Sequence, residues 1–456
     1  MSGCSKEPAA NKAPTPSTTI PSVQPVAGSS PTAQSTAPLQ TKVLTSTLQL
    51  RSARPHEIEY SPQSDIVFSP QGQGVAYIAE KDDYVWVVHN GKPGKRHSDL
   101  SHLVISHDGL HVAYSSRMGD YQQMVSDGME SKPYIDVYDM VYSPDSRHAV
   151  YLAEGADKSG MHIVLDGKPI ETCPNVVTGA FLFTNDSSKL LYHIRPKTEG
   201  PDAQLIILDL ISKSKKIISC LDIEIAINSS RDRIAMAIKD GDKQRVADFA
   251  VATPDKVHTS AVYDVVSDIV VGDDNSVAFI GSRKGHRYLI VNSRETQLPD
   301  ALGAESRPVV QPDGQGGGIV LATKERHNRT YVFYRTDGKK EKIYGKVLEP
   351  VYCRSSGALA YVAQVNDRYS LVLNGKEGPA FDMIVTPMCS PDGRTIAYRG
   401  RNGAKRQVVV ADIATNQHQP HQEYEMIFPA LFAGDGTSIS YGVKEGDNFV
   451  WKVDKL

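Results

Sequence analysis

A short turn motif recurs along the whole of this 456-residue chain. It reads "SPDSRHAVY" from residue 143 and "SPDGRTIAY" from residue 390. Pro fixes φ, Asp bonds its own backbone two residues on, and Gly or Ser accepts unusual dihedral angles, so the motif predicts a tight turn that leads into a strand. Ten copies can be aligned, and they begin at residues 69, 106, 143, 184, 228, 271, 311, 353, 390 and 433.

Successive copies begin 37 to 44 residues apart, and each period has room for four strands. An apolar stretch precedes the turn, and a strand of the "VAY" type follows it. A Val-rich third strand comes next, as in "MHIVLDGK" and "YSLVLNGK", whose Asp-Gly or Asn-Gly ending is a strong hairpin signal. No segment has sustained 3.6-residue apolar periodicity, so we expect almost no helix. Four short antiparallel strands repeated at about 40 residues indicate an all-β chain built of propeller blades.

The repeat resembles the TolB-type, WD-repeat-like (SPDG-repeat) β-propeller family. The blades of that family carry an "F-SPDG-K-IAY" hairpin, which is plainest here at 66–77, 141–151 and 388–398. The resemblance covers residues 60–456, although copies five to eight lose Pro, Asp or Gly. It implies a β-propeller with a ligand site at the mouth of its channel, because TolB receives a peptide segment of a partner there.

The end of the last copy suggests how the propeller closes. The chain stops at "NFVWKVDKL", a third strand, so the last blade lacks one strand. We expect the segment 46–60, "STLQLRSARPHEIEY", to supply it, because an open sheet edge invites aggregation. We expect about ten blades in a single ring, within a propeller domain at 43–456; two smaller rings are the alternative.

Residues 1–42 differ in composition from the rest. They are rich in Pro, Ser, Thr and Ala and have few large apolar residues, so we expect a disordered tether. "SGC" before Ser5 resembles the end of a bacterial lipoprotein signal, which implies a lipid attached to Cys4, although a chance match is the alternative. This predicts a periplasmic or outer-surface lipoprotein of the bacterial cell envelope that meets the membrane only through that lipid.

Composition excludes several classes of function. The formal net charge of −3 argues against nucleic-acid binding, which usually requires a basic excess. No apolar run approaches the roughly 18 residues of a membrane helix. No CxxC or Cys/His zinc spacing occurs, so we expect no metal site and no cofactor. Two bridges or free buried thiols are both compatible with the remaining cysteines, which are Cys173, Cys220, Cys353 and Cys389.

Basic residues follow the "VAY" strand in several copies, at loops that a propeller places around its channel mouth. We expect them to form a basic arc that recognises an anionic glycan, a lipid headgroup or an acidic protein patch. The alternative is an ordinary solvated surface. These residues are Arg283, Lys284, Arg287, Lys324, Arg326, Arg329, Arg399, Arg401, Lys405 and Arg406.

Acidic residues recur seven or eight positions before several turns. Arranged around a ring, they would crowd the channel entrance and bind a cation or a basic segment of a partner. The alternative is that each one accepts backbone N–H bonds where its strand begins. These residues are Asp99, Asp136, Asp222, Asp264, Asp382 and Glu425.

Catalytic motifs are missing from the sequence. There is no GxSxG elbow, no GxxxxGK[ST] loop and no HExxH pair. Acids repeated at one register look structural, whereas catalysis usually brings unlike groups together. We therefore predict a non-catalytic envelope protein that binds a protein partner or an anionic glycan or lipid. The alternative is an envelope polysaccharide hydrolase or lyase with its site in the propeller channel.

Overall fold

The structure is a computed structural model of the whole chain, which divides into two units, Met1–Pro38 and Leu39–Leu456. It describes residues in the second unit only, at the ranges that follow: 42–46, 65–156, 160–173, 175–176, 181–195, 202–221, 225–272, 274–298, 307–310, 318–323, 331–335, 342, 344, 346–353, 356–433 and 435–456. None of these residues lies in a helix, so no helix in the described ranges could span a membrane.

The described strands form ten antiparallel sheets, which we number in chain order. Sheet 1 contains β2 (Ile66–Phe68), β3 (Val75–Lys81), β4 (Tyr84–His89) and β5 (Lys92–Pro93). Sheet 2 contains β6 (Leu100–Ile105), β7 (Val112–Met118), β8 (Tyr121–Ser126) and β9 (Met129–Glu130). Sheet 3 contains β10 (Val137–Tyr142), β11 (Ala149–Glu154), β12 (Met161–Leu165) and β13 (Lys168–Cys173). Sheets 4 and 5 contain β14 (Asn175–Val176), β15 (Leu182–Phe183), β16 (Lys189–Arg195), β17 (Asp202–Asp209) and β18 (Lys215–Leu221); and β19 (Ile225–Ile227), β20 (Arg233–Asp240), β21 (Lys243–Ala250) and β22 (His258–Thr259).

The second half of the chain continues the series. Sheet 6 contains β23 (Val265–Val271), β24 (Val277–Arg283), β25 (His286–Val291) and β26 (Arg294–Gln297). Sheet 7 contains β27 (Arg307–Val310), β28 (Gly318–Thr323) and β29 (Tyr331–Arg335). Sheet 8 contains β30 (Val347–Cys353), β31 (Ala358–Val365), β32 (Arg368–Leu373) and β33 (Lys376–Phe381). Sheets 9 and 10 contain β34 (Met383–Cys389), β35 (Thr395–Asn402), β36 (Lys405–Asp412) and β37 (His418–Pro420); and β38 (Met426–Ile427), β39 (Leu431–Phe432), β40 (Ser438–Glu445) and β41 (Asn448–Lys455), with β1 (Lys42–Ser46).

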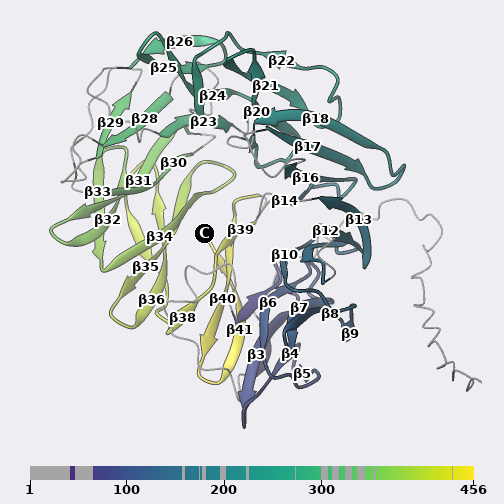
Figure 1. Ribbon diagram of the computed structural model, residues 1–456. Coiled ribbons are helices and arrows are strands. Elements are labelled where there is room, and N and C mark those ends of the chain that lie inside the picture. Colours follow the sequence, from purple (N-terminus) through teal and green to yellow (C-terminus); the bar gives the residue numbers. More distant parts are fainter. Residues whose placement is uncertain are drawn as a thin grey trace, which may run out of the picture. The chain divides into compact units, whose positions relative to one another are not determined.

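Consecutive strands pair within each sheet, except that β14 and β15 both pair with β16, and β38 and β39 both pair with β40. Successive sheets pack face to face (Figure 1). The first strand of a sheet is the innermost strand of a propeller blade. The all-β prediction is confirmed, and the fold is a β-propeller with antiparallel, mostly four-stranded blades.

The turn between the third and fourth strands is formed in the same way in five sheets. An Asn or Asp takes a positive φ, between 46° and 50°, and its Oδ1 accepts the backbone N–H that opens the second strand. Asn374 does this for Leu359 at 3.1 Å, and Asp127 for Val112 at 2.9 Å. Short Asx side chains tolerate the left-handed region, so the same residue forms the turn and caps the neighbouring strand.

The SPDG-type turn also joins neighbouring sheets. Ser106 Oγ donates to Asp108 Oδ1 at 2.5 Å within one turn, while the backbone N–H of Asp108 donates to Ser146 Oγ of the next turn at 3.0 Å. The Asp145 N–H reaches Ser187 Oγ in the same way at 3.0 Å. Ser146 and Ser187 occupy the glycine position of the motif at φ of 63° and 58°. Their hydroxyl groups supply an inter-sheet hydrogen bond that glycine could not.

Most hydrophobic clusters of the described residues lie between two sheets. Phe183 and Tyr192 of sheet 4, for example, are fully buried against Val150, Leu152 and Ile163 of sheet 3. Burial of a side chain of this size contributes about 1.5–3 kcal/mol. A single sheet would leave both of its apolar faces in water, so the fold requires repetition.

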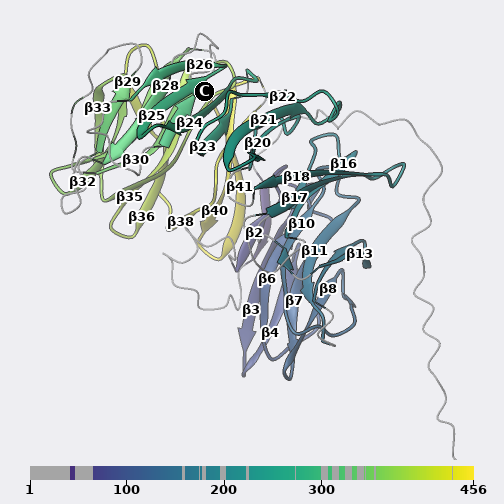
Figure 2. The same cartoon turned by 45° about the horizontal axis from the view of Figure 1, so that its top comes forward.

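The last sheet packs against the first. Phe68 of β2 lies 4.7 Å from Phe428 and 5.7 Å from Phe449, measured between ring centroids, and Figure 2 shows β41 beside β2. The N-terminal strand β1 pairs with β41, with Val43 opposite Val450. A segment before the first sheet therefore adds the missing strand, but it is 42–46 and not 46–60; the predicted residues 47–60 lie outside the described residues.

The first strands of sheets 2, 3, 6, 8 and 9 share an irregularity. The register against the second strand shifts in each, as in β30 between Leu348 and Val351. A non-glycine residue with positive φ lies at the shift, and the five residues are His102, Asp139, Asp268, Glu349 and Thr386. Such β-bulges redirect a side chain that would otherwise alternate with its neighbours.

Candidate anion-binding site

Two of these bulges connect three sheets. Glu349 of β30 accepts the backbone N–H of Thr386 in β34 at 2.6 Å. Thr386 Oγ1 in turn accepts Arg399 Nε of β35 at 3.2 Å, and Arg399 Nη1 donates to the Ile427 carbonyl oxygen of β38 at 2.9 Å. This chain runs from sheet 8 through sheet 9 to sheet 10 and fixes the Arg399 guanidinium.

Arg399 lines a hollow on one face of sheet 9. The register places Arg401 opposite both Met383 and Arg406, and Arg399 opposite Val385, so these side chains share a face. The hollow is small, with a cavity volume of about 10 Å³, and is partly open to solvent. Its lining residues are Met383, Val385, Arg399, Gly400, Arg401 and Arg406.

Two arginine side chains of the hollow donate to backbone carbonyl groups. Arg399 and Arg406 are each only 6% exposed, and Arg406 Nη1 donates to the Glu425 carbonyl oxygen at 2.6 Å. Arg401 Nε is buried and has no hydrogen-bond partner among the described residues. Burial of a guanidinium is costly unless a partner compensates the charge. The six lining residues include no carboxylate, so the hollow favours an anionic ligand.

Glu349 is the acid nearest to this arrangement. Its burial raises the pKa of the carboxyl group, while the Thr386 N–H and the charge of Arg399 act in the opposite direction. Burial is the largest of these effects, so the pKa of Glu349 is raised overall.

The predicted basic arc is only partly brought together. Arg399, Arg401 and Arg406 lie in strands and not in loops, and two of them are buried, which corrects the expectation of exposed loop residues. Lys405 begins β36 and is exposed. Lys324, Arg326 and Arg329 lie outside the described residues.

The sheet 6 members of the arc lie apart from the hollow. Arg283 forms an ion pair with Glu295 at 2.8 Å and stacks over Tyr288 at 5.1 Å. Lys284 is in the turn that follows β24, and Arg287 is in β25. Arg283 is therefore already paired within its own sheet.

The predicted acids bond locally. Asp264 accepts the Lys284 N–H at 2.9 Å and pairs with Lys243 of the preceding sheet at 3.0 Å. Asp382 accepts the Gly403 N–H at 2.7 Å and lies 3.5 Å from Arg368 Nε of the preceding sheet. These contacts join neighbouring sheets at the loop end.

The remaining predicted acids have similar contacts. Asp99 and Asp136 accept the N–H groups of the residues that follow them, at 2.9 and 2.8 Å, and Glu425 lies 3.6 Å from Lys444. Asp222 lies outside the described residues, as does Cys4.

Of the four cysteines that the structure describes, two form a disulfide and two are free. Cys353 and Cys389, at the ends of inner strands β30 and β34, are bonded to each other. Cys220 Sγ lies 3.5 Å from His193 Nε2, but burial raises the pKa of Cys220 to about 11 and lowers the pKa of His193 to about 4. The thiol and the imidazole are thus both neutral near pH 7, which disfavours nucleophilic chemistry.

Sequence reasoning missed the bulge residues. A signal was present at a nearly constant spacing. His102, Asp139, Glu349 and Thr386 each lie four residues before the first residue of a turn motif, and Asp268 lies three residues before one. Our interpretation treated "DMVY" and "DIVV" as apolar stretches and overlooked the polar residue that opens them.

Comparison with known proteins bears on the fold. No protein-family model and no curated protein matches the sequence. The β-propeller domain of the Trilobed protease from Pyrococcus furiosus is similar at 11% identity and a TM-score of 0.34, over 59% of this chain and 92% of that chain. TolB from Acinetobacter baumannii is similar at 13% identity and a TM-score of 0.30, over 67% of this chain and 76% of that chain. An oligogalacturonate lyase in complex with manganese is similar at 12% identity and a TM-score of 0.33, over 78% of this chain and 97% of that chain. These likenesses concern the propeller fold and carry no argument about ligand or activity.

Proposed function

We propose that this protein is a non-catalytic binding propeller of the bacterial cell envelope, and that the arginine hollow of sheet 9 receives an anionic group of its ligand. The observation that carries the proposal is the convergence of Arg399, Arg401 and Arg406 on one open hollow whose lining residues include no carboxylate. Guanidinium groups bind carboxylate and phosphate through paired N–H bonds. The ligand class is therefore a polymer or a protein partner that presents such groups.

Binding fits the lining of the hollow better than catalysis does. A hydrolase or lyase would need an acid and a base beside the substrate, and the six lining side chains include no carboxyl and no imidazole group. An envelope location is supported by the Cys353–Cys389 disulfide, since disulfides persist in oxidising compartments. A lipid on Cys4 would hold the propeller at a membrane.

Titration calorimetry tests the anion site with three probes, which are polygalacturonate, polyphosphate and uncharged dextran. We expect one or both polyanions to bind and dextran not to bind; the two polyanions distinguish carboxylate from phosphate recognition. Arg401→Gln should weaken binding about 10- to 100-fold, as loss of a charged hydrogen bond does. The matched control is Arg117→Gln, an exposed arginine at the end of β7. Equal affinity in wild type and Arg401→Gln, or no binding of either polyanion, would reject the proposal.

A further inference from the structure

The turn end of the sheets exposes large apolar side chains. We define the turn end as the end with the connections between first and second strands and between third and fourth strands. Ile211 is 85% exposed there, Leu110 68%, Met129 63% and Val257 45%. These residues come from sheets 2, 4 and 5. Leu110, Ile211 and Val257 lie between strands, and Met129 is the first residue of β9 after its turn.

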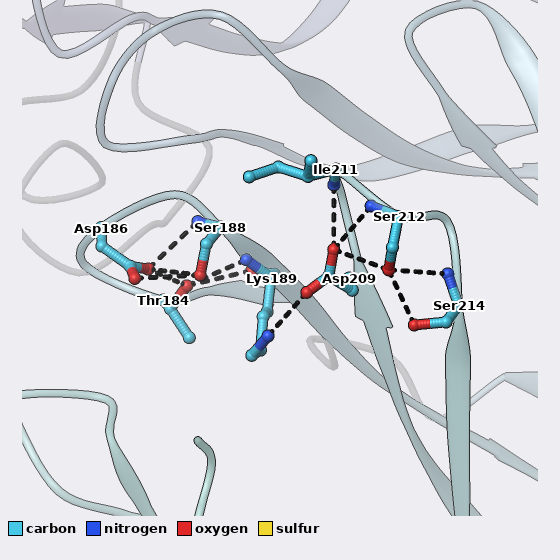
Figure 3. Close-up of polar contacts among 8 residues, drawn as sticks. All are labelled: Thr184, Asp186, Ser188, Lys189, Asp209, Ile211, Ser212 and Ser214. Carbon is cyan, nitrogen blue, oxygen red and sulfur yellow. Dashed lines mark hydrogen bonds and ion pairs between the residues drawn. The ribbon is translucent and has the colours of Figure 1, made fainter. Parts of the chain in front are cut away.

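Ile211 is held in a rigid turn. Asp209 Oδ1 accepts the N–H groups of Ile211 and Ser212 at 3.1 and 2.8 Å, and Asp209 Oδ2 pairs with Lys189 at 2.8 Å. Figure 3 shows this network, in which Ile211 takes part only through its backbone. The polar bonds therefore fix the turn while the isoleucine side chain remains in solvent.

Cations surround these apolar tips. Exposed basic side chains lie at turn positions of sheets 1, 3, 4, 5, 6 and 8, and they have no ion-pair partner within the described ranges. They are Lys92, Arg147, Lys168, Lys213, Lys256, Arg294 and Lys376. Lys213 is two residues from Ile211, and Lys256 is adjacent to Val257.

Some carboxylates at the same turns accept backbone N–H groups, and others pair with lysine. Asp255, in the turn that holds Val257, is exposed and pairs with Lys216. Asp108 accepts the Leu110 N–H at 3.0 Å, and Asp127 accepts the Val112 N–H at 2.9 Å. Asp209 caps its own turn in the same manner. These four carboxylates are thus engaged by local partners.

We infer that the turn end of the propeller is a membrane-contacting surface that docks on an anionic lipid bilayer. Single apolar tips separated by polar backbone suit a bilayer, because each tip can enter the interface independently. A protein interface would instead require a contiguous desolvated centre. Unpaired lysine and arginine side chains beside the tips complement anionic headgroups. This surface is separate from the arginine hollow, so the inference is independent of the proposed function.

Vesicle co-sedimentation tests the inference. The full chain carrying Cys4→Ser, to which no lipid can be attached, is mixed with vesicles of phosphatidylcholine alone or of equal parts phosphatidylcholine and phosphatidylglycerol. We expect binding to the mixed vesicles, weakened by salt, and little binding to phosphatidylcholine alone. The combined Leu110→Ser, Met129→Ser and Ile211→Ser variant should bind about tenfold or more weakly.

A matched control changes apolar residues at the opposite end. Tyr84 and Tyr121 are the first residues of β4 and β8 and are 50% and 43% exposed. Tyr84→Ser with Tyr121→Ser should bind vesicles as the parent does. Thermal unfolding checks that all variants fold alike. Parent protein that stays in the supernatant with mixed vesicles would overturn the inference and assign the surface to a protein partner. Undiminished binding by the triple variant would overturn it as well.

Discussion

Glu349 and Thr386 occupy the same bulge position in neighbouring inner strands, and the carboxylate of Glu349 accepts the backbone N–H of Thr386 at 2.6 Å. The hydrogen bond joins sheet 8 to sheet 9 beside the arginine hollow. An irregularity that would only be a defect in one sheet thus links two sheets.

Glu349→Gln should change how stability depends on pH. Burial raises the pKa of Glu349 in the folded state, so its contribution to the free energy of unfolding is full below the ordinary glutamate pKa and is lost as pH rises through the raised value. The variant does not ionise, so its stability relative to wild type should increase as pH rises above the ordinary glutamate pKa of about 4. Urea unfolding at several pH values measures this, with exposed Glu423→Gln as the control. A relative loss of stability with rising pH would contradict it.

Removal of the disulfide should destabilise the fold. The bond closes a loop between residues 36 apart, so Cys353→Ala with Cys389→Ala should lower the free energy of unfolding by about 2–4 kcal/mol. A reductant should have the same effect on wild type and none on the double variant. Cys173→Ala with Cys220→Ala keeps the bridge and should stay sensitive to reductant; insensitivity there would refute the assigned pairing.

Gly72→Ala tests the contact between the first and last sheets. Gly72 has φ +62°, and a Cβ there would lie 2.2 Å from Cε2 of Trp451 in β41. Gly119 has nearly the same φ, +63°, with nothing within 4 Å of its Cβ position. Gly119→Ala should therefore lower the free energy of unfolding only by the strain of the left-handed backbone, about 1–2 kcal/mol. Gly72→Ala should lower it distinctly more, because its Cβ also meets Trp451. Equal costs in chemical denaturation would mean that sheets 1 and 10 do not pack as described.

Asn374→Ala should destabilise the fold, because Asn374 both forms the turn after β32 and accepts a backbone N–H of β31. The buried strand beginning at Leu359 would lose the acceptor for its N–H, at a cost of about 1–3 kcal/mol. Asn374→Asp should be close to neutral, because Asp127 and Asp166 serve the same role in sheets 2 and 3. The free energy of unfolding checks both variants. An aspartate variant as unstable as the alanine variant would show that the cap contributes little.

Much of the architecture could be predicted because its causes are local. The SPDG-type and Asn-Gly turns encode their own backbone angles, and alternating apolar residues encode strands, so the repeat predicted sheets at about 40-residue spacing. The arginine hollow was predicted less well than the fold. Arg399, Arg401 and Arg406 were recognised as basic, but their strand positions and burial depend on register against β34 and on the carbonyl groups of sheet 10.

By itself, therefore, the sequence determined the repeating unit, its turns and the need for neighbours, since each depends on residues close together in the chain. Only the tertiary structure decided which two cysteines meet, where Glu349 reaches Thr386, and that residues 42–46 complete the last sheet. Those contacts join residues tens to hundreds of positions apart. Their partners follow from the way whole sheets stack, which no local pattern of residues encodes.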